Sequence, residues 1–274
     1  MIKQRKKFSL RLCALFNYLI LLLFILPEPC FARASPVVPK VLTWTLVATY
    51  PHDPQAYTQG LIFLGDGVLG ESTGLNGKST IRRVDLKSGR VLSEAKLADE
   101  YFGEGLVRLG SEYIQLTWKN EKALIWGWNE KAGWKQKRSL AFKGEGWGLS
   151  ATESGKIVMS DGTSKVTIRD PKDLTIERHI TIKSGSLEYD SINELEVVGG
   201  HLYANRWQTS QILRIDLRTG DITGLIDLSK LIPKGLEKSQ DAVANGIAWN
   251  PKDKVFYVTG KFWPNLYAIK ISEK

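Results

Sequence analysis

A short cluster of polar residues and glycine recurs five times along the chain, each time at the start of an apolar run. The clusters are centred on Gln59, Glu104, Glu145, Glu194 and Asn245. Successive centres are 45, 41, 49 and 51 residues apart, which is the period of four-stranded propeller blades and not of leucine-rich repeats. We therefore predict an all-β fold, a five-bladed β-propeller in which each blade brings one polar cluster to the same end.

The residues between the clusters are typical of short strands joined by tight turns. Gly65-Asp66-Gly67 and Lys87-Ser88-Gly89 separate apolar runs of the first repeat, and such turns are hairpin signals. No stretch shows a sustained helical apolar period, so the chain is predicted to be almost entirely β. The strands expected in the first repeat are 61–64, 68–72, 79–86 and 91–96.

The last repeat is one strand short. After Asn245 only residues 247–250, 255–259 and 265–271 have the character of strands before the chain ends. Residues 41–50 precede the first cluster and alternate apolar with polar side chains. We expect them to supply the missing strand, because this would close the ring and remove an exposed sheet edge.

The first 34 residues are predicted to be a signal peptide. An apolar run over residues 12–26 and the small-residue sequence Ala32-Arg33-Ala34 follow a basic start, which is the order found in secretory signals. An uncleaved membrane anchor is the alternative, although the run is short for a spanning helix. Lipid attachment at Cys30 is disfavoured by Pro29. We expect export, to the periplasm or the exterior, with residues 35–274 forming one domain.

Removing this segment changes the net charge and the cysteine content of the chain. It carries a net charge of +5 out of the chain's +9, so the remaining +4 is too small to indicate nucleic-acid binding or stable membrane association. Cys13 and Cys30 both lie in it, so the mature chain has no thiol for disulfides, catalysis or metal binding. We expect the mature protein to be a monomer.

Histidine chemistry is also disfavoured. His52, His179 and His201 are far apart in sequence, and none has the spacing of a zinc site or of a serine triad. His52 is interpreted as a loop residue. No metal ligands are therefore predicted from side chains, and carboxylates, amides and tryptophans remain as the candidates for chemistry.

Several motifs together resemble the glutamine cyclotransferases of the plant and bacterial type, from about residue 43 to residue 271. Each motif is short, but they occur in order at suitable spacing. The resemblance implies a five-bladed propeller. The motifs are Tyr57-Thr58-Gln59-Gly60-Leu61, Phe102-Gly103-Glu104-Gly105-Leu106, Leu116-Thr117-Trp118, Glu145-Gly146-Trp147-Gly148-Leu149, Asn193-Glu194-Leu195-Glu196, Asn245-Gly246-Ile247-Ala248 and Thr259-Gly260-Lys261-Phe262-Trp263-Pro264.

The resemblance implies conversion of the amino-terminal glutamine of a peptide into pyroglutamate, with release of ammonia. It assigns the proton transfer to Glu104, acting first as a general base and then as a general acid. Glu145 has the same Gly-Glu-Gly sequence around it and is therefore the alternative candidate for the proton-transfer acid. The apolar neighbour Phe102 favours Glu104, because an apolar wall raises the pKa of a carboxyl group.

The same resemblance implies the other residues of the pocket, each with a structural alternative. Trp118, Trp147 and Trp207 are expected to surround the glutamine side chain rather than pack in the core. Gln59 and Asn193 are expected to hold the carboxamide oxygen, unless they are turn amides. Lys261 would bind substrate or tune Glu104, or else be an exposed strand-end lysine. Tyr57, where the family has phenylalanine, and Phe102 complete the expected substrate-binding set.

Two further expectations concern the bound cofactors and the functional class of the protein. By resemblance, the central tunnel holds a structural divalent cation through backbone carbonyls, and no cofactor takes part in catalysis. The alternative class is a secreted, non-enzymatic propeller that binds a peptide or a partner protein in its mouth, since the same fold serves both purposes. A cofactor-dependent oxidoreductase or metal lactonase would need inward carboxylate and histidine ligands that the sequence does not supply.

We expect the mature protein to begin near Ser35, because the apolar run ends just before an Ala-x-Ala cleavage site. Mass spectrometry of the exported protein would locate the new amino terminus. A full-length chain recovered from the membrane fraction would contradict this expectation.

Overall fold

The computed structural model describes residues 38–273. The predicted signal peptide, residues 1–34, lies outside them. Within the described residues the chain is all-β, and its only helical element is a 3-10 turn, η1 (Ser229–Leu231). Among these residues, no helix has the length and apolarity needed to cross a membrane.

Three antiparallel sheets of four strands follow one another along the chain. The first contains β2 (Thr58–Gly65), β3 (Val68–Thr73), β4 (Thr80–Asp85) and β5 (Val91–Lys96). The second contains β6 (Gly103–Leu109), β7 (Glu112–Thr117), β8 (Lys122–Asn129) and β9 (Gly133–Ala141). The third contains β10 (Leu149–Ala151), β11 (Ile157–Ser160), β12 (Lys165–Arg169) and β13 (Ile176–Thr181).

The remaining strands form one eight-stranded sheet and a small hairpin. The hairpin pairs β14 (Lys183–Ser184) with β15 (Leu187–Glu188). The larger sheet has two halves of four strands. One half contains β16 (Ile192–Val198), β17 (His201–Arg206), β18 (Gln211–Asp216) and β19 (Ile222–Asp227). The other contains β1 (Lys40–Pro51), β22 (Asn265–Glu273), β21 (Val255–Gly260) and β20 (Ala244–Asn250).

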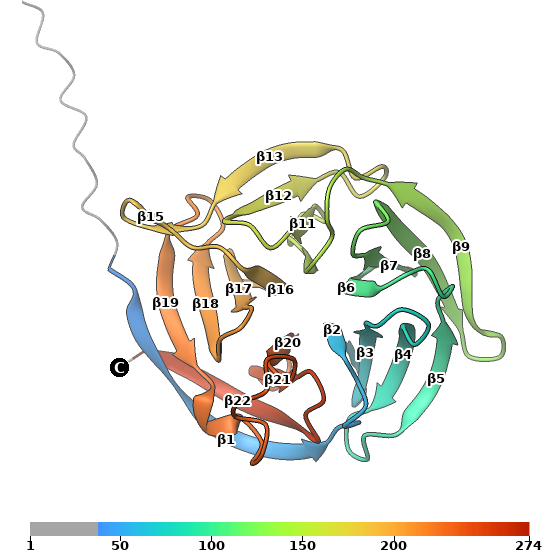
Figure 1. Cartoon of the computed structure of the whole chain (residues 1–274), viewed down its shortest axis with the longest axis horizontal. Helices are drawn as coiled ribbons and strands as arrows, with labels where there is room; N and C mark the ends of the chain where they lie inside the picture. The colour runs from blue at the N-terminus through green and yellow to red at the C-terminus, as the bar shows by residue number, and fades with distance from the viewer. Residues whose placement is uncertain (1–37, 274) are drawn as a thin grey trace, which may run out of the picture. The chain divides into compact units, whose positions relative to one another are not determined.

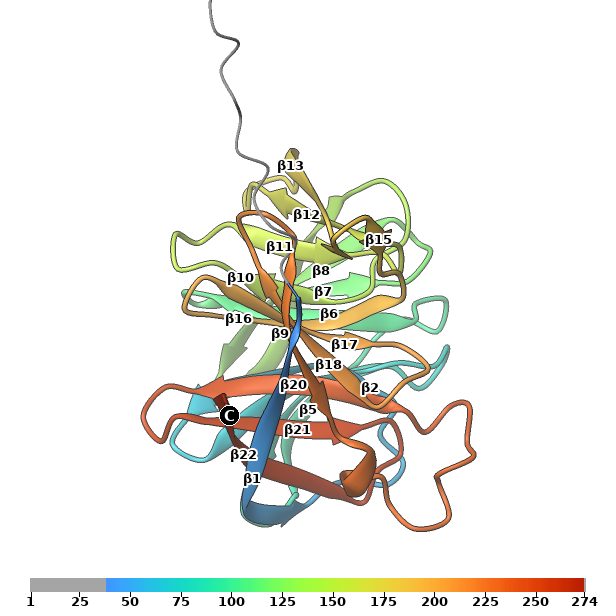
Figure 2. The ribbon, with the colours of Figure 1, turned by 90° about the vertical axis from the view of Figure 1, so that its left-hand side faces the viewer.

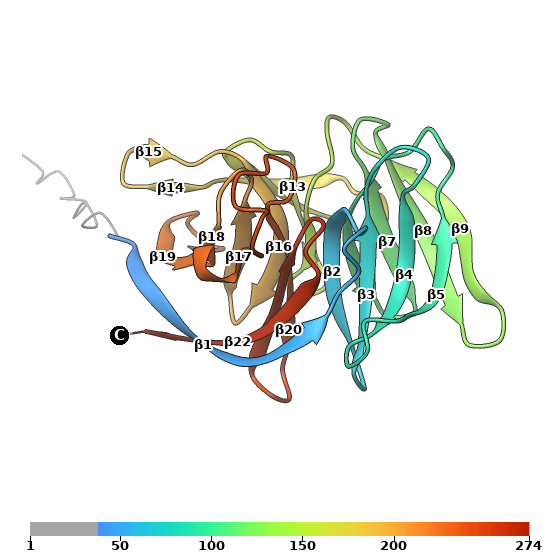
Figure 3. The same ribbon diagram turned by 60° about the horizontal axis from the view of Figure 1, so that its bottom comes forward.

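Strand β1 is the junction between the two halves. It pairs antiparallel with β22 from Leu42 to Pro51, so the amino-terminal segment is the outer strand of the last repeat, as the sequence predicts. Figure 2 and Figure 3 show β1 running alongside β22. Residues 40–42 of β1 also pair in parallel with residues 224–226 of β19. The sequence does not predict this second pairing, because it joins strands of two different repeats.

The first strand of each repeat is an edge strand of its sheet. In Figure 1, β2, β6, β16 and β20 lie nearest the point where the sheets meet. Strands β2, β6, β10, β16 and β20 contact one another in that order, and β20 returns to β2. The outermost strands, such as β5, β9 and β13, lie at the periphery. The recurring polar clusters are therefore brought together where the innermost strands meet.

Glycine makes the contact between innermost strands possible. A Cβ atom added to Gly60 would lie 2.5 Å from the backbone nitrogen of Leu106 in the next repeat. One added to Gly105 would lie 2.6 Å from the carbonyl oxygen of Trp147, to which the Gly105 N–H donates. Real Cβ atoms do not approach backbone so closely, so larger residues would push the strands apart.

Hydrophobic side chains fill the space between neighbouring sheets. Leu116 and Ile125 of the second sheet pack against Leu149 and Met159 at the start of the third. Burial of each such side chain contributes about 1.5–3 kcal/mol. The sheets therefore hold one another in place through their faces, while the polar clusters stay at their inner edges.

A buried ionic cluster supports the first repeat. The carboxylate of Glu71 accepts hydrogen bonds from His52 Nε2 at 3.0 Å, Thr58 Oγ1 at 2.7 Å and Arg82 Nε at 2.9 Å. Burial alone would raise the pKa of Glu71, but Arg82 and His52 outweigh it and hold the pKa well below its usual range. His52 also contacts the Trp263 carbonyl through Nδ1 at 2.7 Å. It lies in a loop, as predicted, yet it is buried and joins two segments of the chain.

We expect Glu71→Ala to lower the free energy of unfolding by about 3–5 kcal/mol, because it leaves buried cations without their partner. Glu112→Ala is the matched control: Glu112 pairs with Arg138 at 2.7 Å, but both side chains are partly exposed. An exposed pair of this kind contributes less than about 1 kcal/mol. Urea unfolding curves would measure both changes, and equal losses would contradict the assigned role of the buried cluster.

Candidate active site

One pocket, with a volume of about 150 Å³, opens where the innermost strands meet. The strands supply some of its side chains, and the turns next to strand ends supply the others. All nine site residues proposed from the sequence line this pocket: Tyr57, Gln59, Phe102, Glu104, Trp118, Trp147, Asn193, Trp207 and Lys261.

Glu104, on β6, is the buried acid of the pocket, with 4% of its surface exposed. Burial raises its pKa well above the usual value for a carboxyl group, Lys261 opposes this rise, and Glu145 adds to it. The Oε1 atom of Glu104 accepts a hydrogen bond from Gln59 Nε2 at 2.9 Å. A carboxyl group with a raised pKa can both accept and return a proton near neutral pH.

Lys261 is the buried cation of the pocket, with only 2% of its surface exposed. Burial lowers its pKa to about 8, although Glu104 opposes this change. Its Nζ atom lies 4.4 Å from the centre of the Tyr57 ring, a favourable position for a cation over an aromatic face. Its backbone N–H donates to the Val243 carbonyl at 3.0 Å. The alternative of an exposed strand-end lysine is therefore wrong.

Aromatic rings form the walls of the pocket. The Phe102 ring packs edge-on against Tyr57 and Trp118, with ring centres 5.8 Å and 5.6 Å away. Trp147 and Trp207 form a second edge-on pair at 5.5 Å. Such contacts fix the rings and give the pocket a large apolar surface from which water is readily excluded.

Glu145, the alternative candidate for the proton-transfer acid, does not line the pocket. Its Oε2 atom accepts hydrogen bonds from Trp118 Nε1 at 2.7 Å and from Trp147 Nε1 at 3.0 Å. Burial raises its pKa, but these indole groups and Lys119 outweigh that effect and lower it below the usual value. Glu145 is therefore an ionised acceptor that holds two walls of the pocket.

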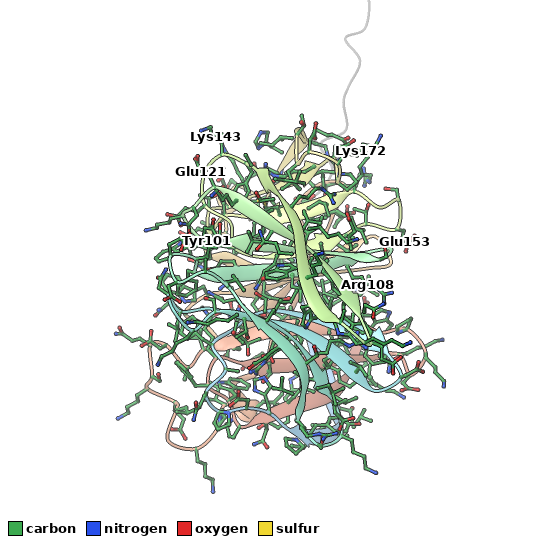
Figure 4. All side chains as sticks on the ribbon, turned by 90° about the vertical axis from the view of Figure 1, so that its right-hand side faces the viewer. Tyr101, Arg108, Glu121, Lys143, Glu153 and Lys172 are labelled. Carbon is green, nitrogen blue, oxygen red and sulfur yellow. The ribbon has the colours of Figure 1, made fainter. Side chains whose placement is uncertain are left out.

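The turn that carries Glu145 is itself fixed from outside the pocket. Glu121 accepts hydrogen bonds from the Gly144 N–H at 3.0 Å and from Lys143 Nζ at 3.2 Å. Figure 4 shows Glu121 and Lys143 next to each other at the edge of the molecule. The position of Glu145 thus depends on a surface contact that the motifs do not reveal.

The amides differ from one another in their hydrogen bonds. Gln59 donates through Nε2 to Glu104, and its Oε1 accepts from Asn245 Nδ2 at 3.1 Å. Asn193 is 1% exposed, and its Oδ1 atom has no hydrogen-bond partner among the described residues. Asn193 is therefore the amide with an oxygen available to a bound molecule, whereas Gln59 is already oriented toward Glu104.

Glu194, the centre of the fourth cluster, has a structural position. Its carboxyl oxygens accept from the Leu61 N–H at 3.2 Å and the Ile247 N–H at 2.7 Å, which joins three innermost strands. Two positions away, burial raises the pKa of Glu196 to about 8, and this carboxyl accepts from the Trp249 N–H. The repeat pattern marks Glu194, but it does not separate such strand-linking acids from pocket acids.

Comparison with known proteins identifies relatives over almost the whole chain. The family model described as glutamine cyclotransferase matches residues 20–271. A protein of Arabidopsis thaliana named glutaminyl-peptide cyclotransferase is 37% identical over 278 residues, which cover 98% of this chain and 85% of that relative. The crystal structure of Myxococcus xanthus glutaminyl cyclase matches with a TM-score of 0.77 and 32% identity, over 86% of this chain and all of that one. The chain therefore belongs to the glutamine cyclotransferase family.

Proposed function

We propose that this protein is a glutaminyl-peptide cyclotransferase that converts the amino-terminal glutamine of peptides and proteins into pyroglutamate and releases ammonia. One observation carries the proposal: Glu104 is buried in an aromatic pocket, and its pKa is raised well above the usual value. Family membership and the named relatives support the same activity.

The first step that we propose is ring closure. The neutral substrate α-amine attacks the γ-carboxamide carbon and gives one N–H proton to the Glu104 carboxylate, which leaves a tetrahedral centre with no extra proton on the ring nitrogen. Because α-ammonium groups have a pKa near 8, part of the substrate is already neutral near neutral pH, and a carboxyl with a raised pKa holds the released proton better than an ordinary glutamate. The aromatic walls would hold the methylene groups and bring the two reacting atoms together.

The second step is loss of ammonia. The proton held by Glu104 passes to the carboxamide nitrogen, the carbon–nitrogen bond breaks, and the carboxylate is restored. Asn193 would hold the carboxamide through its unpartnered oxygen, which can accept from the substrate NH2 group. The second N–H of Gln59 would steady the developing oxyanion, since only one N–H is directed at Glu104.

Lys261 would stabilise negative charge in this reaction. Its buried ammonium lowers the pKa of Glu104 from the value that burial alone would give. A cation beside a carboxyl group also stabilises the oxyanion of the tetrahedral centre, because both charges lie in a site of low dielectric constant.

We also propose that the sheets are the five blades of a propeller. The two halves of the eight-stranded sheet would be separate blades linked by the short pairing between β1 and β19. The contact of five innermost strands in cyclic order supports this assignment. In this arrangement β1 is the strand that closes the ring.

Two proposals rest on the sequence and on family resemblance. The first is export of the mature, monomeric enzyme after removal of residues 1–34. The second is a structural divalent cation held by backbone carbonyl oxygens. Residues 38–273 contain no group of three or more His, Cys, Asp or Glu side chains arranged for a metal.

We expect Glu104→Gln to lower kcat by at least about 100-fold with little change in folding or substrate affinity, because glutamine keeps the shape but cannot relay a proton. Glu145→Gln should lower kcat by less than about 10-fold, since the glutamine side chain can still accept a hydrogen bond from an indole N–H. Ammonia release from a glutaminyl dipeptide measures both rates.

The opposite ranking of these two variants would show that Glu145 is the proton-transfer acid. Binding of glutaminyl peptides without any ammonia release, in the parent protein, would instead favour the non-enzymatic alternative. Isothermal titration calorimetry distinguishes this case from a protein that does not bind such peptides.

Chelators that remove accessible zinc should leave the initial rate within about two-fold of the untreated rate, because the proposed proton transfer needs no metal. Loss of a buried structural ion would lower the unfolding temperature rather than the rate. Prompt loss of activity that zinc restores, in a protein that circular dichroism shows to be folded, would contradict the mechanism.

A further inference from the structure

Asn245 links two innermost strands that share no backbone ladder. It lies on β20, is fully buried, and donates through Nδ2 to two acceptors on β2. These are the Thr58 carbonyl oxygen at 2.9 Å and Gln59 Oε1 at 3.1 Å. The amide nitrogen carries two hydrogens, so each acceptor receives one.

The first of these contacts fixes the orientation of Asn245. A carboxamide has similar shape when its oxygen and nitrogen are exchanged, so packing alone does not determine which end faces a neighbour. The backbone carbonyl of Thr58 can only accept a hydrogen bond. The nitrogen of Asn245, and not its oxygen, must therefore face β2.

The second contact passes this orientation on to Gln59. The Asn245 N–H group meets the oxygen end of the Gln59 carboxamide, so the nitrogen end is turned to Glu104, 2.9 Å away. A rotated Gln59 would place its oxygen against a carboxyl oxygen of Glu104, which repels when Glu104 is ionised.

We propose that Asn245 is a positioning residue that holds the Gln59 carboxamide with its amino group toward Glu104. Asn245 does not line the pocket and acts on the reaction only through Gln59. Its catalytic consequence rests on the proposed function, whereas its effect on the Glu104 carboxyl does not.

The consequence is a defined shift in the titration of Glu104. A hydrogen bond donated to a carboxylate favours its charged form, so the oriented Gln59 holds the pKa of Glu104 below the value that burial alone would give. The charged groups that act on Glu104 are Lys261, which lowers its pKa, and Glu145, which raises it. Without Asn245, Gln59 loses its orientation and the pKa rises.

The test compares Asn245→Leu with Asn250→Leu. Asn250 lies on the same strand, is 2% exposed, and also donates through Nδ2 to two partners, Asp253 and Tyr257. Leucine has similar size and adds no charge. We expect the pKa of Glu104 to rise by about one unit in Asn245→Leu, the size of a hydrogen bond to a charged group, and to stay unchanged in the control.

Carbon-13 NMR of side-chain carboxyl groups measures this pKa, with the Glu104 resonance identified by its absence in Glu104→Gln. The acid limb of the kcat/KM profile should move to higher pH by the same amount. In a Gln59→Met background, Asn245→Leu should add no further shift, because no amide remains to be oriented.

An unchanged Glu104 titration in folded Asn245→Leu would overturn the inference, as would a full shift in the Gln59→Met background. Asn245→Ser, which is smaller and also lacks the amide, replaces Asn245→Leu if the leucine variant does not fold. We expect the same rise in the pKa of Glu104 for Asn245→Ser. A parent protein that releases no ammonia from glutaminyl peptides would refute the proposed function, while the NMR titration would still decide the role of Asn245.

Discussion

The close contact between the five innermost strands is the constraint on which the rest of the structure depends. At Gly60 and Gly105 the backbone of the next repeat occupies the space that a Cβ atom would need. Strands at this distance bring side chains from separate repeats into one pocket, so Gln59 of β2 reaches Glu104 of β6. The recurring glycines of the sequence are thus a packing requirement, and the shared pocket is its result.

Burial alone does not determine the charge of an acid in this protein. Glu71 and Glu104 are both buried, yet the pKa of Glu71 is lowered and that of Glu104 is raised. The difference lies in their partners. Arg82 and His52 bond directly to Glu71, which fixes it as a structural anion. Glu104 has a neutral amide as its hydrogen-bond partner and one buried lysine nearby, which leaves it free to exchange a proton.

The sequence was sufficient to predict the elements and the pocket residues but not the contacts behind them. Repeated clusters and turns predicted the strands, including the one at residues 41–50. The family motifs contain eight of the nine residues that line the pocket, and the resemblance as a whole implied the ninth, Trp207. Motifs do not record which end of an amide faces a neighbour, as with Asn245. Nor do they show that the loop residue His52 is buried, or that β1 also pairs with β19, because these features depend on segments far apart in sequence.

Neutral amides suit a site in which a carboxyl group must change its charge. A lysine or arginine in place of Gln59 would hold Glu104 ionised, much as Arg82 holds Glu71. A second carboxylate there would repel the first and keep it protonated. The carboxamide chain from the Thr58 carbonyl through Asn245 and Gln59 can orient Glu104 without adding a charge of its own. Its fixed direction comes from a backbone carbonyl, so the fold itself determines which end of the Gln59 amide faces Glu104.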